Sequence, residues 1–391
     1  MTGSCNLDCV YCTYGELYEG NETRNRKRIN IHNAKKLLLY IIDLKKENKI
    51  NKLNISFYGG EPLLNFFFIR NIIEFTNQLN AEKKNDIFYS MTTNATLIHK
   101  HIEFLVANKF DLFISLDGNL ENHGYRVFKN NKKNSFEKLI ENIDLIQRDY
   151  YDYFVNHVKF LSVLHNRNSV KDIFEFINTR YNKIPIISEL SHNNLKPDKK
   201  AVFETMYLNK RKSEIEFQQD ESNLLHKTIY KFSYYELYNF LNYLSINFYI
   251  SNITSMLIDI ENYFPTSTCF PFARKIFLTS DNRLLPCERI NFKYSFGEVN
   301  KNVIIDIPTI TKQYNYYYDH LKKVCENCYA YKFCGLCMFH ISNLDKLDKE
   351  EFICDHFCDY KAFQNKMYRI FSFLEKYPND FFQILENIKP E

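Results

Sequence analysis

The stretch IFYSMTTNATLIHKHIEFLVANKFDLFISL, residues 87–116, carries the pattern that decides the fold class. Residues 87–91 are a β-rich run, residues 96–107 have helical periodicity, and residues 110–116 are a second β-rich run. A strand, a helix and a second strand in so short a span predict two parallel strands joined by a crossover helix. The stretch therefore predicts an α/β fold.

The same alternation continues on both sides of this stretch. Further strands are predicted at 53–57, 158–164 and 184–190, and further helices at 34–46, 66–79, 136–148 and 169–181. Ser135 has the position and the side chain of an N-cap for the third of these helices. The repeated order predicts a parallel sheet with helices outside it. Functional residues are then expected at the carboxyl ends of the strands.

Composition excludes several classes of protein. The 391 residues are 45% hydrophobic and include 35 Phe and 29 Tyr, which is too apolar for a chain without a core. The sequence has no run of about 18 apolar residues and no basic segment followed by an apolar one at its start, so we expect no membrane span, no secretory signal and a cytoplasmic location. The 51 basic and 47 acidic residues give no electrostatic case for nucleic-acid binding.

The 11 Cys residues fall into two groups. Three lie within the first 12 residues, eight lie between positions 269 and 358, and residues 13–268 contain none. Thiols that only filled a core would be spread along the chain. An odd total without an export signal argues against a disulfide framework. Metal ligation in a reducing cytosol is the better account, and zinc and iron–sulfur both remain open.

The first group has the spacing CxxxCxxC, formed by Cys5, Cys9 and Cys12 in CNLDCVYC. Three thiolates this close together can hold three corners of a [4Fe–4S] cube, which leaves the fourth iron open for a chelating ligand. A structural zinc site would need a fourth ligand, and the next His or Cys along the chain is His32.

With Tyr11 placed before the last of these cysteines, the sequence resembles the radical S-adenosylmethionine (SAM) superfamily. Downstream, Tyr58, Gly59, Gly60, Glu61 and Pro62 resemble that family's GGEP motif at the end of its strand. The resemblance implies that the glycines permit close backbone approach. It also implies that the carboxylate binds the amino group of SAM.

Two further motifs extend the resemblance. Residues 93–97, TNATL, resemble the family's T-N-G-T segment with Ala95 in the glycine place, and residues 115–118 match S-[IL]-D-G. Arg126 falls where related enzymes pair an arginine with the SAM carboxylate, and Leu164 and Asn166 lie where adenine contacts are common. The residues implied to bind SAM are Tyr11, Gly59, Gly60, Glu61, Pro62, Asn94, Ser115, Asp117, Arg126 and Leu164. A polar strand cap is the alternative for Ser115 and Asp117.

The second cysteine group resembles the SPASM extension of radical SAM enzymes, which holds two auxiliary [4Fe–4S] clusters. Asn282 stands where that pattern has a glycine, and Asn is the next-best residue for a left-handed turn. The resemblance implies a distal cluster on Cys325, Cys328, Cys334 and one of Cys354 or Cys358. It implies a proximal cluster on Cys269, Cys287, Cys337 and the remaining Cys, or with an open iron if that residue does not reach. A zinc ribbon is the alternative for this group.

Glu288 directly follows Cys287, and in related sulfatase maturases an acidic residue at this position is a candidate general base. A surface carboxylate paired with Arg289 is an equal alternative. The resemblance also implies a partial (β/α)6 TIM-like barrel. Because only four residues precede Cys5, either the start codon is placed too late, or the chain is a fragment without the first strand, or the barrel opens unusually. We expect the barrel at 1–194, a helical bridge at 195–264 and the small Cys-rich α+β domain, with C-terminal helices, at 265–391.

The function implied by the resemblance is radical chemistry on a peptide. SAM would be cleaved reductively to a 5′-deoxyadenosyl radical that abstracts hydrogen from a ribosomally made peptide, leading to a thioether or carbon–carbon cross-link. A formylglycine-forming anaerobic sulfatase maturase is the close alternative, and a non-catalytic iron–sulfur or zinc scaffold for a peptide is the alternative of another class. The implied partners are a precursor peptide or protein, a flavodoxin- or ferredoxin-type electron donor and a separate leader-recognition protein.

Overall fold

The computed structural model describes residues 2–20, 27–47, 52–83, 86–219, 265–331, 334–341, 344–349, 352, 354, 356–376 and 378–379. The chain divides into two compact units. The first contains residues 1–217, 278–284 and 291–305, and the second contains 218–277, 285–290 and 306–391.

The first unit contains a five-stranded parallel sheet in the order β1-β2-β3-β4-β5. Its strands are β1 (Lys52–Phe57), β2 (Asp86–Thr93), β3 (Asp111–Ser115), β4 (Val158–Val163) and β5 (Ile186–Ser188). All five predicted strands are therefore confirmed, and so is the α/β class. The described residues before Cys5 form no strand, and Thr2 makes an isolated bridge with Arg28.

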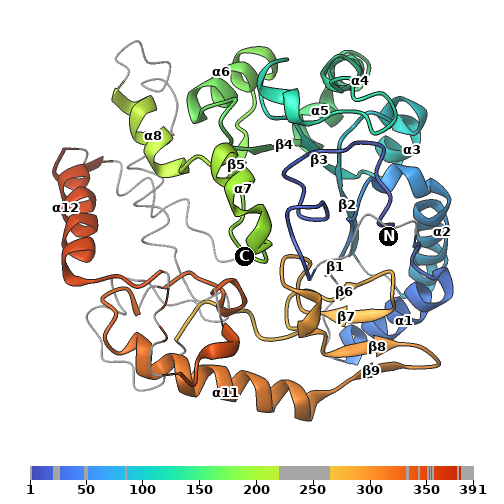
Figure 1. The fold of residues 1–391 in the computed structure, drawn as a ribbon. Helices are drawn as coiled ribbons and strands as arrows, with labels where there is room; N and C mark the ends of the chain where they lie inside the picture. The colour runs from blue at the N-terminus through green and yellow to red at the C-terminus, as the bar shows by residue number, and fades with distance from the viewer. Residues whose placement is uncertain are drawn as a thin grey trace. The chain divides into compact units, whose positions relative to one another are not determined.

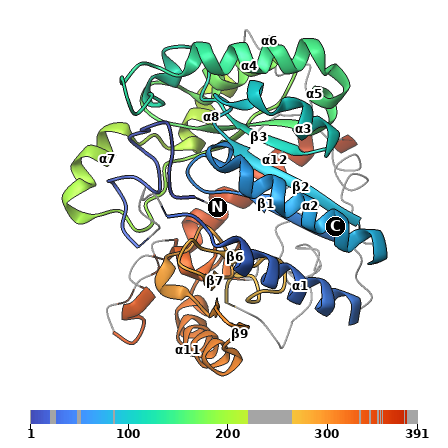
Figure 2. The same cartoon turned by 90° about the vertical axis from the view of Figure 1, so that its right-hand side faces the viewer.

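Helices α2 to α6 lie on the outer side of this curved sheet (Figures 1 and 2). The helices of the first unit are α1 (Ile31–Glu47), α2 (Phe66–Lys83), α3 (Ile102–Ala107), α4 (Phe136–Asp149), α5 (Tyr151–His157), α6 (Val170–Tyr181), α7 (Lys200–Met206) and α8 (Lys210–Gln219). The predicted bridge is described only as far as α8, and residues 220–264 lie outside the described residues. The sheet forms the core because Leu112, Ile114 and Phe160 on its central strands have no solvent exposure.

Two local predictions in this unit need correction. Ser135 does not cap α4 with its side chain, because its backbone is already helical (φ −84°, ψ −3°). An N-cap residue needs an extended backbone to turn its oxygen back onto the helix. The predicted helix at 96–107 is a 3₁₀ turn, Ile98–Lys100, followed by α3. The short helix α5 was not predicted.

A second, four-stranded sheet has the order β6-β7-β8-β9. Its strands are β6 (Phe277–Leu278), β7 (Arg283–Leu285), β8 (Gly297–Val299) and β9 (Val303–Ile305). Asn282 has φ +64°, which confirms the left-handed turn expected there. The Asn33 side chain of α1 donates to the carbonyl of Val299 over 2.9 Å, so β8 packs with the first unit.

The second unit contains α11 (Ile307–Cys325) and α12 (Tyr360–Lys376), with 3₁₀ turns at Met338–His340 and Leu344–Lys346. Helix α12 confirms one of the C-terminal helices predicted for this domain, and residues 380–391 lie outside the described residues. Within the described ranges, no helix has the length and apolar character required to cross a membrane.

Candidate functional site

The segment that leads into Cys5 is held by Gly60 and Glu61, which follow β1. The Gly60 amide donates to the carbonyl of Thr2 and the Glu61 amide to the carbonyl of Ser4, both over 2.9 Å. A Cβ atom on Gly60 would lie 2.1 Å from the Ser4 carbonyl oxygen. The predicted close backbone approach therefore exists, and the approaching backbone is the chain's own.

Glu61 is buried without solvent exposure at the end of β1. Its carboxylate accepts hydrogen bonds from the Leu63 amide (3.0 Å), the Thr93 hydroxyl (2.8 Å) and the Asn94 amide (2.8 Å). Burial raises the pKa of Glu61 to about 7, although these hydrogen bonds oppose the rise. Both carboxylate oxygens accept hydrogen bonds from residues at the end of β2, so Glu61 holds the turn that follows this strand. Its predicted contact with the SAM amino group stays a prediction.

Asn94 joins that turn to the first cysteine. Its side-chain amide donates to the Asn6 side chain over 2.9 Å and approaches the Cys5 sulfur at 3.8 Å. Its own oxygen accepts from the Thr96 hydroxyl over 2.7 Å. Ala95, in the place of the family glycine, has φ +58°, which explains why a glycine is suited to this position.

Asp117 follows β3 and forms a buried ion pair with Arg126. The Arg126 guanidinium binds it with two hydrogen bonds, Nε–Oδ2 at 2.8 Å and Nη2–Oδ1 at 2.9 Å. The Val163 amide donates to Oδ1 over 3.0 Å, and the Tyr11 hydroxyl donates to Oδ2. Burial alone would raise the pKa of Asp117, but the Arg126 charge and hydrogen bonds from His165 and Arg126 outweigh it and hold the pKa well below its usual range.

Aromatic rings enclose Tyr11 between Cys9 and Cys12. His165 stacks on Tyr11 with ring centroids 5.5 Å apart, and Tyr125 meets both rings edge to face. The Arg126 guanidinium lies 5.5 Å from the Tyr11 ring centroid. Sequence reasoning missed Tyr125 and His165, although His165 is the first residue after the predicted strand at 158–164.

The remaining predicted SAM residues lie at the ends of neighbouring strands. Ser115 is the last residue of β3 and is half-buried, and Leu164 follows β4 with no solvent exposure. Pro62 is buried in the 3₁₀ turn Pro62–Asn65 that Glu61 caps. The fold thus gathers these residues at one end of the sheet, while their individual contacts with SAM stay predictions.

Cys5, Cys9 and Cys12 form no disulfide and are half-buried on a loop of tight turns. The Leu7 amide donates to the Cys5 sulfur over 3.4 Å, and the Cys12 amide donates to the Cys9 carbonyl over 3.3 Å. Across the described part of the chain, no three His, Cys, Asp or Glu side chains are gathered closely enough to hold a single metal ion. The donor set, three thiols on one short loop with an apolar floor of Tyr11 and Leu17, fits a cluster with one open corner.

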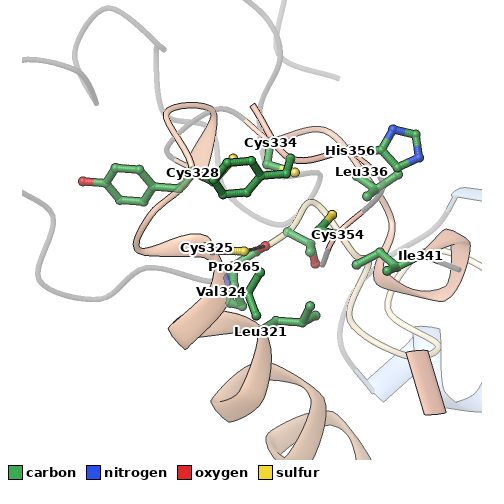
Figure 3. A pocket seen from close by; sticks show the side chains of 13 residues that line it. Pro265, Leu321, Val324, Cys325, Cys328, Cys334, Leu336, Ile341, Cys354 and His356 are labelled. Atoms are coloured by element: carbon green, nitrogen blue, oxygen red, sulfur yellow. Dashed lines mark hydrogen bonds between the residues drawn. The ribbon is translucent and has the colours of Figure 1, made fainter. Parts of the chain in front are cut away.

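Four cysteines of the second group surround one pocket at the carboxyl end of α11 (Figure 3). They are Cys325, Cys328, Cys334 and Cys354, and the apolar side chains of Leu321, Val324 and Ile341 complete the wall. Burial raises the pKa of the Cys325 thiol to about 12 and that of Cys334 to about 11, with neighbouring cysteines adding to the rise at both. Four thiols so placed fit an iron–sulfur cluster, whose positive irons would favour their ionised form.

Cys358 does not line this pocket. Its amide donates to the Cys328 sulfur over 3.4 Å, and its carbonyl accepts from the Tyr329 amide over 2.9 Å. Of the two alternatives left open for the distal set, the structure therefore brings Cys354 to the other three.

The other three cysteines, Cys269, Cys287 and Cys337, gather beside Tyr314 of α11. Burial raises the pKa of the Tyr314 hydroxyl, and the charges of Tyr318 and of these three thiols raise it further. Cys358 lies instead beside Cys328, whose sulfur accepts from the Cys358 amide. Cys269, Cys287 and Cys337 are three of the cysteines of the predicted proximal set, and their binding of a cluster stays a prediction.

Glu288 has a different partner from the one expected. Lys275 Nζ lies 2.9 and 3.1 Å from its two carboxylate oxygens, whereas Arg289 Nε lies 3.9 Å away. Its side chain is 14% exposed, so it is not a surface carboxylate. Burial would raise the pKa of Glu288, but the Lys275 charge and hydrogen bond lower it overall. One oxygen lies 3.5 Å from the Cys287 sulfur.

Comparison with known proteins gives the class of the first unit. Residues 1–179 match the family model of the Radical SAM superfamily, so this part of the chain is a radical SAM domain.

Particular relatives follow from the same comparison. The chain is 32% identical over 154 residues to a cysteine-type anaerobic sulfatase-maturating enzyme of Clostridium novyi, covering 39% of this chain and 40% of the relative. It is 26% identical over 187 residues to the radical SAM cyclopropyl synthase TigE of Paramaledivibacter caminithermalis, covering 46% of this chain and 36% of the relative. The matches thus span about two fifths of these relatives.

A solved structure resembles the fold over almost the whole chain. It is native anSMEcpe with bound AdoMet and Kp18Cys peptide, with a TM-score of 0.62, 18% identity, and coverage of 98% of this chain and 97% of that one. At this identity the likeness shows the fold alone.

Proposed function

We propose that this chain is a radical SAM enzyme that modifies a peptide or protein. The observation that carries the proposal is the attachment of the Cys5–Cys12 loop to the strand ends. Gly60 and Glu61 after β1 bind the residues before Cys5, Asn94 after β2 reaches Cys5, and Asp117 after β3 binds Tyr11. A loop of three thiols over the carboxyl ends of a parallel sheet is the place where such a fold holds its reacting groups.

A [4Fe–4S] cluster with SAM on its open iron would supply the 5′-deoxyadenosyl radical that abstracts hydrogen from the substrate. Cys5, Cys9 and Cys12 would hold that cluster. The protein's own residues would orient the cofactor and exclude water, since Tyr11, Asp117 and Arg126 are all buried. The same proposal includes two auxiliary clusters on the second cysteine group. With the first cluster, this gives three cubane clusters in total. Its partners would be a peptide, a flavodoxin- or ferredoxin-type donor and a separate leader-recognition protein.

We infer a cross-linking reaction, thioether or carbon–carbon, as the modification. The proximal set supports it, because three thiols leave room for a fourth ligand from a substrate cysteine. Formylglycine formation in a sulfatase is the second candidate, supported by the sulfatase-maturating relative and by the Cys-containing peptide named in the solved structure.

Anaerobic reconstitution tests the enzyme. We expect the chain, loaded with iron and sulfide and supplied with SAM and dithionite, to release 5′-deoxyadenosine, detected by chromatography and mass spectrometry. A chain carrying Cys5→Ala, Cys9→Ala and Cys12→Ala is the control and should release none. Failure of the loaded wild type to release 5′-deoxyadenosine, with or without peptide, would favour the non-catalytic scaffold.

Peptide mass separates the two reactions. A cross-link removes two hydrogen atoms and keeps the sulfur, whereas formylglycine formation from Cys replaces the sulfur with an aldehyde oxygen. We expect a Cys-rich peptide encoded beside this gene to lose two hydrogens. Turnover of a sulfatase-derived peptide alone would select the second candidate.

Glu288 keeps its predicted role as general base within this proposal. We expect Glu288→Gln to lower peptide modification by about a hundredfold, within the usual range for a general base. The release of 5′-deoxyadenosine without peptide should stay unchanged. Equal loss of both activities would show that the carboxylate supports the fold rather than the reaction.

A further inference from the structure

The carboxylate of Asp117 is saturated by groups of its own chain. Oδ1 accepts from Arg126 Nη2 and from the Val163 amide, and Oδ2 accepts from Arg126 Nε and the Tyr11 hydroxyl. A carboxylate offers about four lone-pair sites, and these four hydrogen bonds use all of them, with His165 Nε2 also 3.7 Å from Oδ2. With no solvent exposure at Asp117, the side chain has neither a free acceptor nor a free face for a ligand.

One of those four donors comes from the cysteine loop. Tyr11 lies between Cys9 and Cys12, and its hydroxyl reaches Asp117 at the end of β3. The ring is fixed on both sides, by stacking on His165 and by the edge of Tyr125. The Tyr11 side chain therefore ties the loop segment that carries two of the three thiols to the sheet.

The other donors keep Asp117 in place for this task. Arg126 is 8% exposed, so its charge is neutralised inside the protein. An ion pair with two charge-assisted hydrogen bonds fixes the orientation of the carboxylate as well as its distance from the guanidinium. The Val163 amide at the end of β4 holds the same carboxylate from the neighbouring strand.

We propose that Asp117 is a positioning residue that sets the Cys9–Cys12 segment for cluster binding through Tyr11 and does not itself contact SAM. The inference rests on the proposed function in one respect, because it assigns Cys5, Cys9 and Cys12 to a cluster. It replaces the direct SAM contact expected for Asp117 with an action that precedes SAM binding.

Retention of the cluster without SAM separates the two roles. A ligand of SAM acts only when SAM is present, whereas a residue that orients the loop acts in its absence. We therefore measure the rate at which a chelator removes iron from the anaerobically loaded, SAM-free chain. The first site is the group Cys5, Cys9 and Cys12. Its iron is the iron content of this chain minus that of the variant with Cys5→Ala, Cys9→Ala and Cys12→Ala.

Tyr11→Phe removes only the hydroxyl and leaves the Asp117–Arg126 pair intact. We expect this variant to lose first-site iron about tenfold faster than wild type, the usual weight of one hydrogen bond to a charged group. Tyr153→Phe is the matched control, because it removes a buried hydroxyl that binds the Phe110 carbonyl at the opposite end of β3. Equal rates of iron loss in the two variants would overturn the proposal.

Asp117→Asn tests the other partner. We expect faster iron loss than in Tyr11→Phe, and we expect the double variant to be no worse than Asp117→Asn alone, because both changes break one link. Wild-type retention in Asp117→Asn combined with weakened SAM binding would overturn the proposal. If Asp117→Asn does not fold, Tyr11→Phe decides alone. Iron retention is independent of turnover, so a wild type that binds iron but never forms 5′-deoxyadenosine would refute only the proposed function.

Discussion

Glu61 and Asp117 are both enclosed by the radical SAM domain, yet their pKa values shift in opposite directions. Asp117 has a guanidinium beside it, whereas Glu61 has only uncharged donors. Desolvation therefore prevails at Glu61 and is overcome at Asp117. Of these two carboxyl groups, Glu61 alone is expected to exchange a proton near neutral pH.

Glu61 should make the stability of the domain depend on pH. Its folded pKa of about 7 lies above its ordinary value of 4.5, so the stabilising contribution is complete below pH 4.5 and is lost as pH rises to 7. The free energy of unfolding of wild type relative to Glu61→Gln should fall by about 3 kcal/mol across this window. Urea unfolding of both metal-free proteins at several pH values checks this, and a constant difference would contradict it.

Gly60→Ala tests the close approach before Cys5. A methyl group at this position would lie 2.1 Å from the Ser4 carbonyl oxygen, which is backbone and cannot swing away. We expect about 1–3 kcal/mol of destabilisation and loss of first-site iron. Gly124→Ala is the control, since its methyl group would meet the exposed end of Arg167 at 2.6 Å. Comparable damage from both variants would contradict the backbone explanation.

At the level of single residues, the sequence predicted which side chains gather but not what each one touches. Glu61, Asn94 and Asp117 were recognisable because each follows a predicted strand. Their partners come from distant segments, as in the bond between Tyr11 and Asp117, 106 residues apart. No local pattern encodes such a pairing.

Among the elements, strands were predicted better than helices. The five strands are dense apolar runs, and burial in a parallel sheet requires this composition. Helix α11 was missed because its many Tyr and Thr residues have the composition of a strand. Its signals were present all the same. Asp306 caps the helix by accepting from the Thr309 amide, and Ile310, Tyr314 and Tyr317 are buried at helical spacing.

Ser169, and not Ser135, is the serine that caps a helix of this domain. Its hydroxyl oxygen accepts from the Asp172 amide over 3.0 Å at the start of α6. We expect Ser169→Ala to lower the free energy of unfolding by about 1 kcal/mol. Thr205→Ala is the control, because this exposed hydroxyl only binds back within α7, to the Val202 carbonyl, and its loss should stay within about 0.5 kcal/mol. Equal costs in urea unfolding would contradict the capping role.

For the molecule as a whole, the grouping of cysteines predicted two metal-binding regions, but not which cysteines of the second group share a pocket. Spacing alone could not separate Cys354 from Cys358, which are four positions apart. The chain path brings only Cys354 to the pocket of Cys325, Cys328 and Cys334. The segment 291–305 packs with the first unit, which its position between Cys287 and Cys325 did not indicate.

Iron content tests this assignment. Three cubane clusters give about 12 iron atoms per chain, and we expect Cys354→Ala to remove about four of them. Cys358→Ala should keep the full complement, because its side chain lies outside the pocket. Iron and sulfide analysis of both variants after anaerobic loading measures this. A larger loss from Cys358→Ala would transfer the ligand role to that residue.

Because every thiol belongs to one of the two cysteine groups, thiol labelling can report on the occupancy of the metal-binding regions. All 11 cysteines are half-buried and outside any disulfide, and residues 13–268 contribute none. An alkylating reagent can therefore label only residues assigned here to metal-binding regions, without background from the sheet. The ratio of label on each cysteine peptide with and without iron would give the iron occupancy of each site. The same measurement after exposure to air would show the order in which the sites lose iron.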